Sequence, residues 1–506
     1  MTKSILLTDV TLRDGNQSLA ATRMTREQTM RVLPLLERAG YQRLELWGGA
    51  ILDSCIRFLD EDPWERLEMY NQTLGGSQKI LALLRGQNLF AYQPYSDDLV
   101  ISFVRQAVES GVGAMRIFDA LNDERNLVTA LLATKAYGAK AETALSYTVS
   151  PVHTVDYFVD YARKLEAMGA DQLAIKDMAG LLYPQDAVEL IRKLKQNTSL
   201  PLALHSHTTT GVGLLNAVIG MVYGVDSIDC AITPFAGGSS HPPVELLIPF
   251  AEELGLDHGL DKRFILQAQE ELFRIFNELK DTISYHGRYY RPVNFKQVNR
   301  RQVNEIIRLV KSPVPENIET ALELSRRMLH ELGYPDFDDR IFKSQIPGGM
   351  LSNLRSQLHS MGREDLFDQL MVEIPRVRRD VGYVPLVTPT SQIVGSQAAF
   401  NLMMGAEYVH VSDEFRMLLR GEFGRTPAQP NPELVSRVLG ENEEPLRYRA
   451  ASYLPPVLED RVELPFVRTH KDLLLHFLFK EAADAFLEKR YRDELSPVTQ
   501  SEYQRA

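Results

Sequence analysis

The chain has 506 residues, and its 56 Lys and Arg against 67 Asp and Glu give a formal net charge of -11. A net negative surface repels polyanions, so nucleic acid and anionic membranes are not expected as partners. No apolar run approaches the roughly 18 residues that a membrane helix needs, and the start of the chain does not resemble an export segment. The chain has only two cysteines, Cys55 and Cys230. These features predict a cytoplasmic enzyme.

The first half of the chain alternates short apolar runs with longer runs of helical period, which is typical of βα units and a parallel sheet. Strands are expected at residues 5–12, 43–47, 79–85, 114–120, 143–148, 172–177, 201–207 and 227–232. Helices are expected between them at 26–38, 98–109, 125–137, 155–168, 184–195 and 211–223. The residues expected to cap these helices are Thr25, Asp97, Asp123, Thr154 and Thr210.

Eight such units over roughly 250 residues match the size of one (β/α)8 barrel. An open doubly wound sheet is the alternative, but no G-x-G-x-x-G follows the first predicted strand. We therefore predict an α/β protein with a TIM barrel at 1–260, a mostly helical domain at 261–440 and a charged, helical C-terminal extension at 441–506. Beyond the barrel, helices are expected at 261–280, 315–332, 351–359, 364–372, 396–404 and 473–490.

Polar side chains stand at the carboxyl ends of the predicted strands, where barrel enzymes carry their catalytic groups. In strand order these ends offer Arg13-Asp14, Glu45 to Trp47, Arg85, Asp119, Tyr147, Lys176-Asp177, His205 to His207, and Cys230. A purely structural barrel does not require so many, so an active site is expected at this end.

His205 and His207 are two residues apart on the seventh predicted strand, so their side chains point to the same side. Both imidazoles can then reach one metal ion. Two hydrogen-bonded core histidines are the structural alternative. A carboxylate from Asp14, at the end of the first strand, favours the metal site.

Lys176 comes directly before Asp177, and an ion pair between the two is one interpretation. If Lys176 instead faces a divalent ion, an ammonium group ~4 Å away costs roughly 8 kcal/mol at an effective dielectric of ~20. Such a lysine must be neutral, or carry CO2 as a carbamate that supplies an anionic oxygen ligand.

Arg85 ends an apolar strand, where a planar guanidinium can bind a carboxylate through two hydrogen bonds. An ion pair with Glu45 or Asp119 is the structural alternative. Thr388 and Ser391 lie in a predicted loop at 385–392, where hydroxyl residues are usually part of a turn.

Several stretches resemble the carboxyltransferase domain of biotin-dependent enzymes, a family that includes pyruvate carboxylase, the oxaloacetate decarboxylase alpha subunit and transcarboxylase. They run in collinear order as TLRDGNQSLAATR (11–23), ELWGGAILDSCIRFLDEDPWERL (45–67), LLRGQNLFAY (83–92), RIFDALNDERN (116–126), YTVSPVHT (147–154), IKDMAGLL (175–182), LHSHTTTG (204–211), KSQIPGGMLSNL (343–354) and LVTPTSQIVGSQA (386–398). The chain length and the lack of a Met-Lys-Met biotinylation sequence most resemble the transcarboxylase subunit.

The resemblance implies a (β/α)8 barrel whose mouth is covered by the helical domain. It also implies a divalent metal ion, zinc, cobalt or manganese, in the barrel. The metal ligands that it implies are Asp14, carboxylated Lys176, His205 and His207.

For the substrate, the resemblance implies that Arg85 binds the carboxylate of pyruvate or oxaloacetate. Arg13, Gln17 and Tyr92 are implied to lie beside it. Thr388 is implied to carry a proton between biotin and the methyl group of pyruvate, and Ser391 to help hold biotin.

Two stretches depart from the family pattern. Gly15-Asn16 stands where the family usually has Ala-His, and the loop 237–243 (GGSSHPP) differs from the usual one. Neither change removes a metal-ligand candidate or Arg85.

The predicted function is a carboxyltransferase subunit that moves a carboxyl group between carboxybiotin and pyruvate or oxaloacetate through a metal-stabilised enolate. Because biotin has no attachment site here, it is expected on a separate carrier protein, within a complex in which this chain is a homodimer. A metal-dependent aldolase or Claisen-type condensing enzyme of the same barrel superfamily, acting on a 2-keto acid, is the alternative. The Lys176 motif and PLVTPTSQ (385–392) favour the carboxyltransferase. Retention of the four ligand candidates argues against a scaffold protein with a decayed site.

Overall fold

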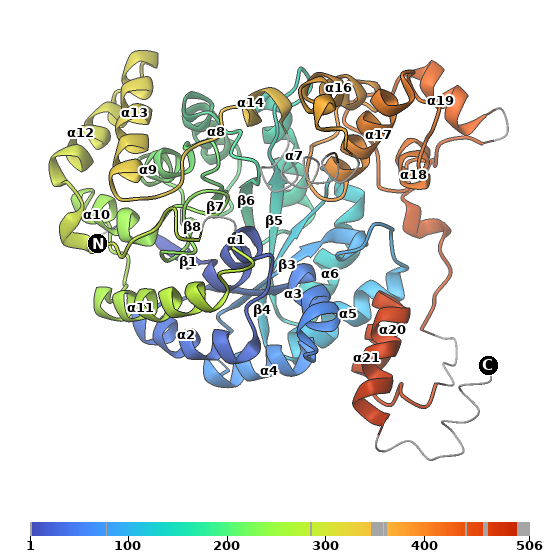
Figure 1. Cartoon of the computed structure of the whole chain (residues 1–506), viewed down its shortest axis with the longest axis horizontal. Helices are drawn as coiled ribbons and strands as arrows, with labels where there is room; N and C mark the ends of the chain where they lie inside the picture. The colour runs from blue at the N-terminus through green and yellow to red at the C-terminus, as the bar shows by residue number, and fades with distance from the viewer. Residues whose placement is uncertain are drawn as a thin grey trace.

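A computed structural model describes residues 3–76, 78–283, 286–345, 358, 362–440, 443–458 and 464–492. Its centre is a closed barrel in which every strand is parallel to its neighbours and β8 pairs with β1, so the predicted TIM barrel is confirmed (Figure 1). The strands are β1 (Leu6–Asp9), β2 (Leu44–Gly48), β3 (Ile80–Arg85), β4 (Val112–Phe118), β5 (Lys140–Ser146), β6 (Gln172–Asp177), β7 (Leu202–Ser206) and β8 (Ser227–Cys230).

The strands are buried along nearly their whole length, because helices cover the outside of the barrel and side chains fill the inside. Inside, residues in register on four neighbouring strands form one small cluster: Phe118, Ala144, Ala174 and Ala203. Outside lie α1 (Asn16–Ala20), α2 (Arg26–Ala39), α3 (Gly49–Ser54), α4 (Pro63–Thr73), α5 (Asp97–Glu109), α6 (Val128–Ala136), α7 (Val155–Ala167), α8 (Pro184–Asn197), α9 (Gly213–Tyr223) and α10 (Val244–Glu253).

The first strand is shorter than predicted. It ends at Asp9, whose carboxylate accepts hydrogen bonds from the backbone N–H and the hydroxyl of Thr11. The backbone N–H groups of Asp14 and Gly15 both donate to the carbonyl of Val10, which closes a π-helical turn, η1 (Thr11–Gly15). The turn, and not a strand end, therefore positions Asp14.

Two of the five predicted helix caps are wrong. Asp97 is already the first residue of α5, and Ser96 precedes the helix. The Thr210 hydroxyl donates to the carbonyl of Gly180, and α9 begins only at Gly213. Thr25 and Thr154 do cap α2 and α7, and Asp123 caps a 3-10 turn that precedes α6, η4 (Glu124–Asn126).

After the barrel the described chain is helical, as predicted. The elements are α11 (Lys262–Glu278), η5 (Phe295–Gln297), α12 (Arg300–Lys311), α13 (Pro315–Glu331), α14 (Ile341–Ser344), η6 (Glu364–Leu366), α16 (Phe367–Asp380), α17 (Thr390–Met404), α18 (Asp413–Arg420), α19 (Pro432–Leu439), η7 (Ala450–Tyr453), α20 (His470–Phe479) and α21 (Glu481–Tyr491). The helix predicted at 473–490 is broken in two at Lys480, where φ is 50°. Apart from Leu358, the predicted helix at 351–359 lies outside the described residues, as does most of KSQIPGGMLSNL.

Helices α14, α16 and α17 lie together along the upper edge of the molecule in Figure 1. Arg378 of α16 donates to the carbonyl of Val149 and the hydroxyl of Thr148, just after β5. The hydroxyl of Tyr334 hydrogen-bonds to Thr233 after β8, at 2.6 Å. The helical region therefore contacts the loops at the mouth of the barrel.

The last two helices, α20 and α21, pack beside the barrel near α5 (Figure 1). Phe479 stacks on Phe90, and Tyr95 donates to the carbonyl of Leu478 at 3.0 Å. No helix in the described ranges is both long and apolar enough to cross a bilayer. The domain boundaries at 260 and 440 stay predictions.

Candidate active site

Asp14 is buried at the mouth of the barrel, where the π-helical turn directs its carboxylate inward. Arg13 Nη2 donates to Asp14 Oδ2 at 2.6 Å, and the Ser18 hydroxyl donates to Oδ1 at 2.9 Å. Burial by itself would raise the pKa of Asp14, but the Arg13 guanidinium holds that pKa well below its usual range. Asp14 is therefore an anion at neutral pH.

His205 and His207 each use one ring nitrogen to fix the ring. His205 Nδ1 lies 2.7 Å from Asp229 Oδ2, and His207 Nδ1 lies 2.6 Å from the carbonyl of Ser239. Because a carbonyl or carboxylate only accepts, Nδ1 carries the proton in both rings and Nε2 keeps a lone pair. Burial lowers the pKa of both histidines, so the rings are neutral.

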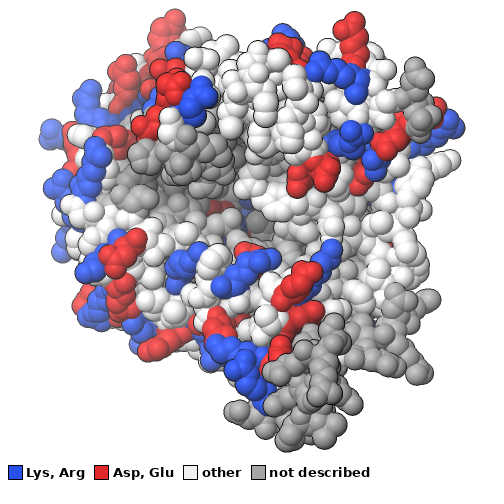
Figure 2. Space-filling view, turned by 45° about the vertical axis from the view of Figure 1, so that its right-hand side comes forward, with Lys and Arg blue, Asp and Glu red and all other residues white. Residues whose placement is uncertain are grey.

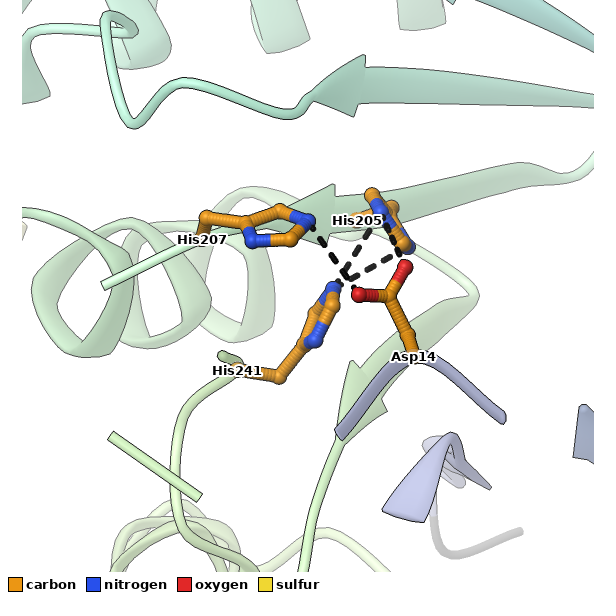
Figure 3. Close-up of side chains that lie close together, drawn as sticks. All are labelled: Asp14, His205, His207 and His241. Carbon is orange, nitrogen blue, oxygen red and sulfur yellow. Dashed lines mark hydrogen bonds and ion pairs between the residues drawn. The ribbon is translucent and has the colours of Figure 1, made fainter. Parts of the chain in front are cut away.

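The Nε2 atoms of both histidines converge on Asp14 (Figure 3). His205 Nε2 is 3.6 Å from Asp14 Oδ2, and His207 Nε2 is 3.7 Å from Asp14 Oδ1. Among the described residues, His207 Nε2 is buried without a hydrogen-bond partner. A carboxylate and two lone pairs at these separations fit ligands around one cation.

Lys176 faces this group from β6, in register with His205 on β7. Its Nζ lies 2.9 Å from His205 Nε2, and the side chain is fully buried. The alternative ion pair with Asp177 is wrong, because Asp177 instead accepts from the backbone N–H groups of Leu181 and Leu182. Burial lowers the pKa of Lys176 to about 8.

The loop after β8 adds a residue that the sequence analysis did not assign to the site. His241 is fully buried, and its ring centroid lies 4.2 Å from that of His205 and 4.3 Å from that of His207. Burial holds the pKa of His241 well below its usual value. The only signal in the sequence was the unusual loop 237–243.

A buried guanidinium supports the site from the barrel interior. Arg116 of β4 donates to Asp229 and Glu142, and to Glu45 at 3.1 Å. Its Nη1 also lies 3.1 Å from His205 Nδ1. Arg116 thereby fixes the carboxylate that orients His205. This role is not visible in the sequence, because a strand pattern does not show which residues face the barrel axis.

Arg13 and Gln17 lie together, with Arg13 Nη1 donating to Gln17 Oε1 at 3.0 Å. Arg13 also forms an ion pair with Glu45. The departures at Gly15 and Asn16 have structural causes. A Cβ at Gly15 would lie 2.7 Å from the carbonyl oxygen of Phe235, and the Asn16 side chain bonds to the backbone of Leu12 and Met24.

Arg85 is buried at the end of β3, and its Nη1 donates to the carbonyl of Ala91 at 2.9 Å. The alternative ion pair with Glu45 or Asp119 is not formed: Glu45 pairs with Arg13 and Arg116, and Asp119 accepts from Asn126 and nearby backbone. Among the described residues, Arg85 Nε has no hydrogen-bond partner. Burial lowers the pKa of Arg85 to about 10, so it stays charged at neutral pH.

Tyr92 connects the barrel to the helical region. Its hydroxyl donates to the side-chain oxygen of Gln392 in the first turn of α17. The predicted loop 385–392 is therefore partly helical from Thr390. Thr388 is exposed, whereas Ser391, next to Gln392, is buried.

Similarity to known families agrees with this geometry. Residues 341–505 match a family described as a conserved carboxylase domain, and residues 119–272 match one described as HMGL-like. The carboxyl transferase domain of Rhizobium etli pyruvate carboxylase, solved with pyruvate and biocytin, superposes with a TM-score of 0.80. That comparison covers 98% of this chain and 79% of the other at 26% identity.

Curated proteins match along nearly the whole chain. A pyruvate carboxylase subunit of Methanocaldococcus jannaschii is 40% identical, covering 97% of this chain and 79% of that protein. The methylmalonyl-CoA carboxyltransferase 5S subunit of Propionibacterium freudenreichii is 38% identical, covering 96% and 88%. The 2-oxoglutarate carboxylase large subunit of Hydrogenobacter thermophilus is 34% identical, covering 98% and 70%. Sequence, barrel and site thus agree, and the chain belongs to the family of biotin-dependent carboxyltransferases.

Proposed function

We propose that this carboxyltransferase moves a carboxyl group between carboxybiotin on a separate carrier protein and pyruvate or oxaloacetate. The observation that carries the proposal is the convergence of Asp14, Lys176 and His205 at the barrel mouth. His207 completes the group. Relatives named for pyruvate carboxylation and for methylmalonyl-CoA carboxyl transfer support it.

The proposed ligands fit a divalent cation such as zinc, cobalt or manganese. Asp14 supplies an anionic oxygen, and His205 and His207 supply neutral nitrogens whose other ring nitrogen is already hydrogen-bonded. A bound cation would polarise the keto oxygen of the substrate and stabilise the enolate.

Lys176 is proposed to be carboxylated. Its neutral amine attacks CO2, which forms the N–C bond of a carbamate and releases one proton. A pKa near 8 keeps a substantial part of the amine neutral near physiological pH. The carbamate replaces an ammonium group, which a metal ion would repel, with an anionic oxygen ligand. Lys176 Nζ lies 2.9 Å from His205 Nε2, so this oxygen would lie beside the other proposed ligands.

Arg85 is proposed to bind the substrate carboxylate. Its guanidinium is buried and charged, and only Nη1 has a hydrogen-bond partner among its described neighbours. A planar donor of this kind binds a carboxylate in a fixed orientation. Arg13, Gln17 and Tyr92 are proposed to line the same site.

Thr388 is proposed to carry a proton between biotin and the methyl carbon of the substrate enolate, with Ser391 holding biotin. In the decarboxylation direction, the C–C bond to the carboxyl group breaks and the biotin nitrogen takes that carboxyl group. The proton that biotin loses passes to the Thr388 hydroxyl, which gives its own proton to the enolate carbon. The contact between Tyr92 and Gln392 supports this role, because it joins the segment carrying Thr388 to the barrel mouth.

The carrier, the other carboxylase subunits, a homodimeric state and a cytoplasmic location are parts of the same proposal. Two relatives are themselves named as subunits, one of a pyruvate carboxylase and one of a methylmalonyl-CoA carboxyltransferase, which supports an assembly. On the face in Figure 2, which is hollowed near its centre, acidic and basic residues are interspersed. That mixed surface suits a protein partner better than a polyanion.

The test is oxaloacetate decarboxylation by the purified chain with and without free biotin, after metal analysis by mass spectrometry. Biotin-dependent release of pyruvate and CO2 is expected, at about one metal ion per chain. Incubation with ¹³C-bicarbonate should give a carbamate NMR signal that a Lys176→Met variant lacks. Biotin-independent turnover, or condensation of acetyl-CoA with a 2-keto acid, would contradict the proposal.

A further inference from the structure

His241 is built into the same site as the proposed metal ligands. The loop that carries it is fixed at both ends: Gly237 N–H donates to the His241 carbonyl at 2.8 Å, and Ala231 N–H donates to the Pro242 carbonyl at 3.1 Å. Thr208, directly after His207, donates its N–H to the Ser240 carbonyl. The backbone around His241 is therefore held against the ends of β7 and β8.

The side chain points at the other donors. His241 Nε2 lies 3.2 Å from each ring nitrogen of His205, and one donor atom from each of Asp14, His205, His207 and His241 lies within 4.8 Å of the others. Figure 3 shows the four side chains facing one another. Ligands placed about 2.1 Å from one ion are at most ~4.2 Å apart, so small rotations bring this set around a single cation.

The hydrogen bonding of His241 is incomplete without a further group. Its Nδ1 is buried and has no partner among the described residues. Among the described residues, the hydrogen-bond contacts of its Nε2 are both with ring nitrogens of His205, whose Nδ1 proton is directed to Asp229. A buried ring nitrogen without a partner is unusual, and Nε2 has only imidazole nitrogens within hydrogen-bond distance among the described residues, so a cation on Nε2 would give the ring a stronger partner.

We propose that His241 is itself a metal ligand, so that three imidazoles and Asp14 hold the ion. This inference rests on the proposed function and extends its metal site. The four donors are complete without Lys176, so carboxylation of Lys176 adds an oxygen ligand to a site that already binds metal. Three imidazole nitrogens favour a transition metal such as Zn²⁺ or Co²⁺ over Mg²⁺ or Ca²⁺.

The experiment uses the full chain, stripped of metal and reloaded with Zn²⁺. X-ray absorption counts the imidazole ligands of the wild type, and chelator competition gives the Kd for Zn²⁺. Three imidazoles are expected in the wild type and two in His241→Gln, with a Kd raised by about 10- to 100-fold or more. Lys176→Met is expected to keep all three.

His153→Gln is the matched control, because His153 is also buried, but its side chain hydrogen-bonds to Ser150 and is not among the four clustered donors. It should leave the Kd unchanged. Two imidazoles in the wild type, or an unchanged Kd in His241→Gln, would overturn the assignment of His241 while the carboxyltransferase function stands. Because the count is made on the wild type, misfolding of a variant does not hide the answer. A wild-type protein that binds no metal would contradict both the assignment of His241 and the proposed carboxyltransferase function.

Discussion

His205 Nδ1 and Asp229 Oδ2 lie 2.7 Å apart inside the barrel, on the adjacent strands β7 and β8. Asp229 is held in turn by the Arg116 guanidinium. A carboxylate behind an imidazole fixes the tautomer and raises the basicity of the other nitrogen. The pair therefore prepares His205 Nε2 to bind a cation.

Asp229→Asn should weaken metal binding and activity by about 10- to 100-fold, because the amide neither carries the charge nor accepts as strongly from His205. The Kd for Zn²⁺ and the rate of oxaloacetate decarboxylation measure both effects. Asp160→Asn, on an exposed part of α7, is the control and should change neither. An unaltered Kd in Asp229→Asn would show that His205 needs no support from Asp229.

Arg85→Lys should raise KM for the keto acid by about 10- to 100-fold, because an ammonium replaces the planar donor with a point charge. Metal content should stay the same. Steady-state kinetics with oxaloacetate provide the measurement, and Arg163→Lys on the exposed surface is the control. If Arg85→Lys kept the KM of the wild type, another side chain would have to bind the substrate carboxylate.

Much of this site could be predicted from the sequence. Parallel strands bring their carboxyl ends to one rim, so Lys176 and His205 had to be close, and the structure pairs them in register. The grouping of Asp14 with the histidines was predicted as well, although the π-helical turn that positions Asp14 was not. That turn depends on two backbone bonds to Val10, which no periodicity reveals.

Other parts could not be predicted, for physical reasons. In a barrel both faces of a strand are buried, so apolar patterning did not show that Arg116 faces the axis. His241 comes from a loop whose path is set by tertiary hydrogen bonds to Thr208 and Ala231. Asp119, also at a strand end, instead accepts bonds from the following loop, which is a structural use.

Tyr92 and Gln392 should act together. Tyr92→Phe and Gln392→Leu each remove the same hydrogen bond, so the double variant should lose little more than either single one. A double-mutant cycle on kcat/KM for biotin is expected to give a coupling of about 0.5–1.5 kcal/mol. Strictly additive effects would mean that the two side chains work independently.

Thr388 and Thr390 should differ despite lying two residues apart. Thr388 is exposed, and Thr388→Ala should lower kcat by about 10²–10⁴-fold with an unchanged Tm, while Thr388→Ser retains activity. Thr390 donates to the carbonyls of Pro385 and Val387, so Thr390→Ala should instead cost about 1 kcal/mol of unfolding free energy. Measuring both Tm and kcat for each variant separates the catalytic effect of Thr388 from the structural effect of Thr390. Full activity in Thr388→Ala would remove it from proton transfer.

Glu245 should make stability depend on pH. Burial raises its pKa from 4.5 to about 7, so the folded state keeps a proton that the unfolded chain has released. The stabilising effect of the protonated form is complete below pH ~4.5 and is lost as the pH rises through ~7, in total roughly 3 kcal/mol. Glu245 accepts bonds from the Gln269 amide and the Thr233 N–H, and its second oxygen has no partner among the described residues.

Glu245→Gln removes this titration while keeping the shape of the side chain. Its Tm relative to the wild type should therefore rise between pH 5 and pH 8, as measured by thermal unfolding across that range. Glu331→Gln, on an exposed part of α13, is the control and should show a constant difference. If the Glu245→Gln difference also stayed constant, Glu245 would be charged in the folded protein, and the proton on its second oxygen would be excluded.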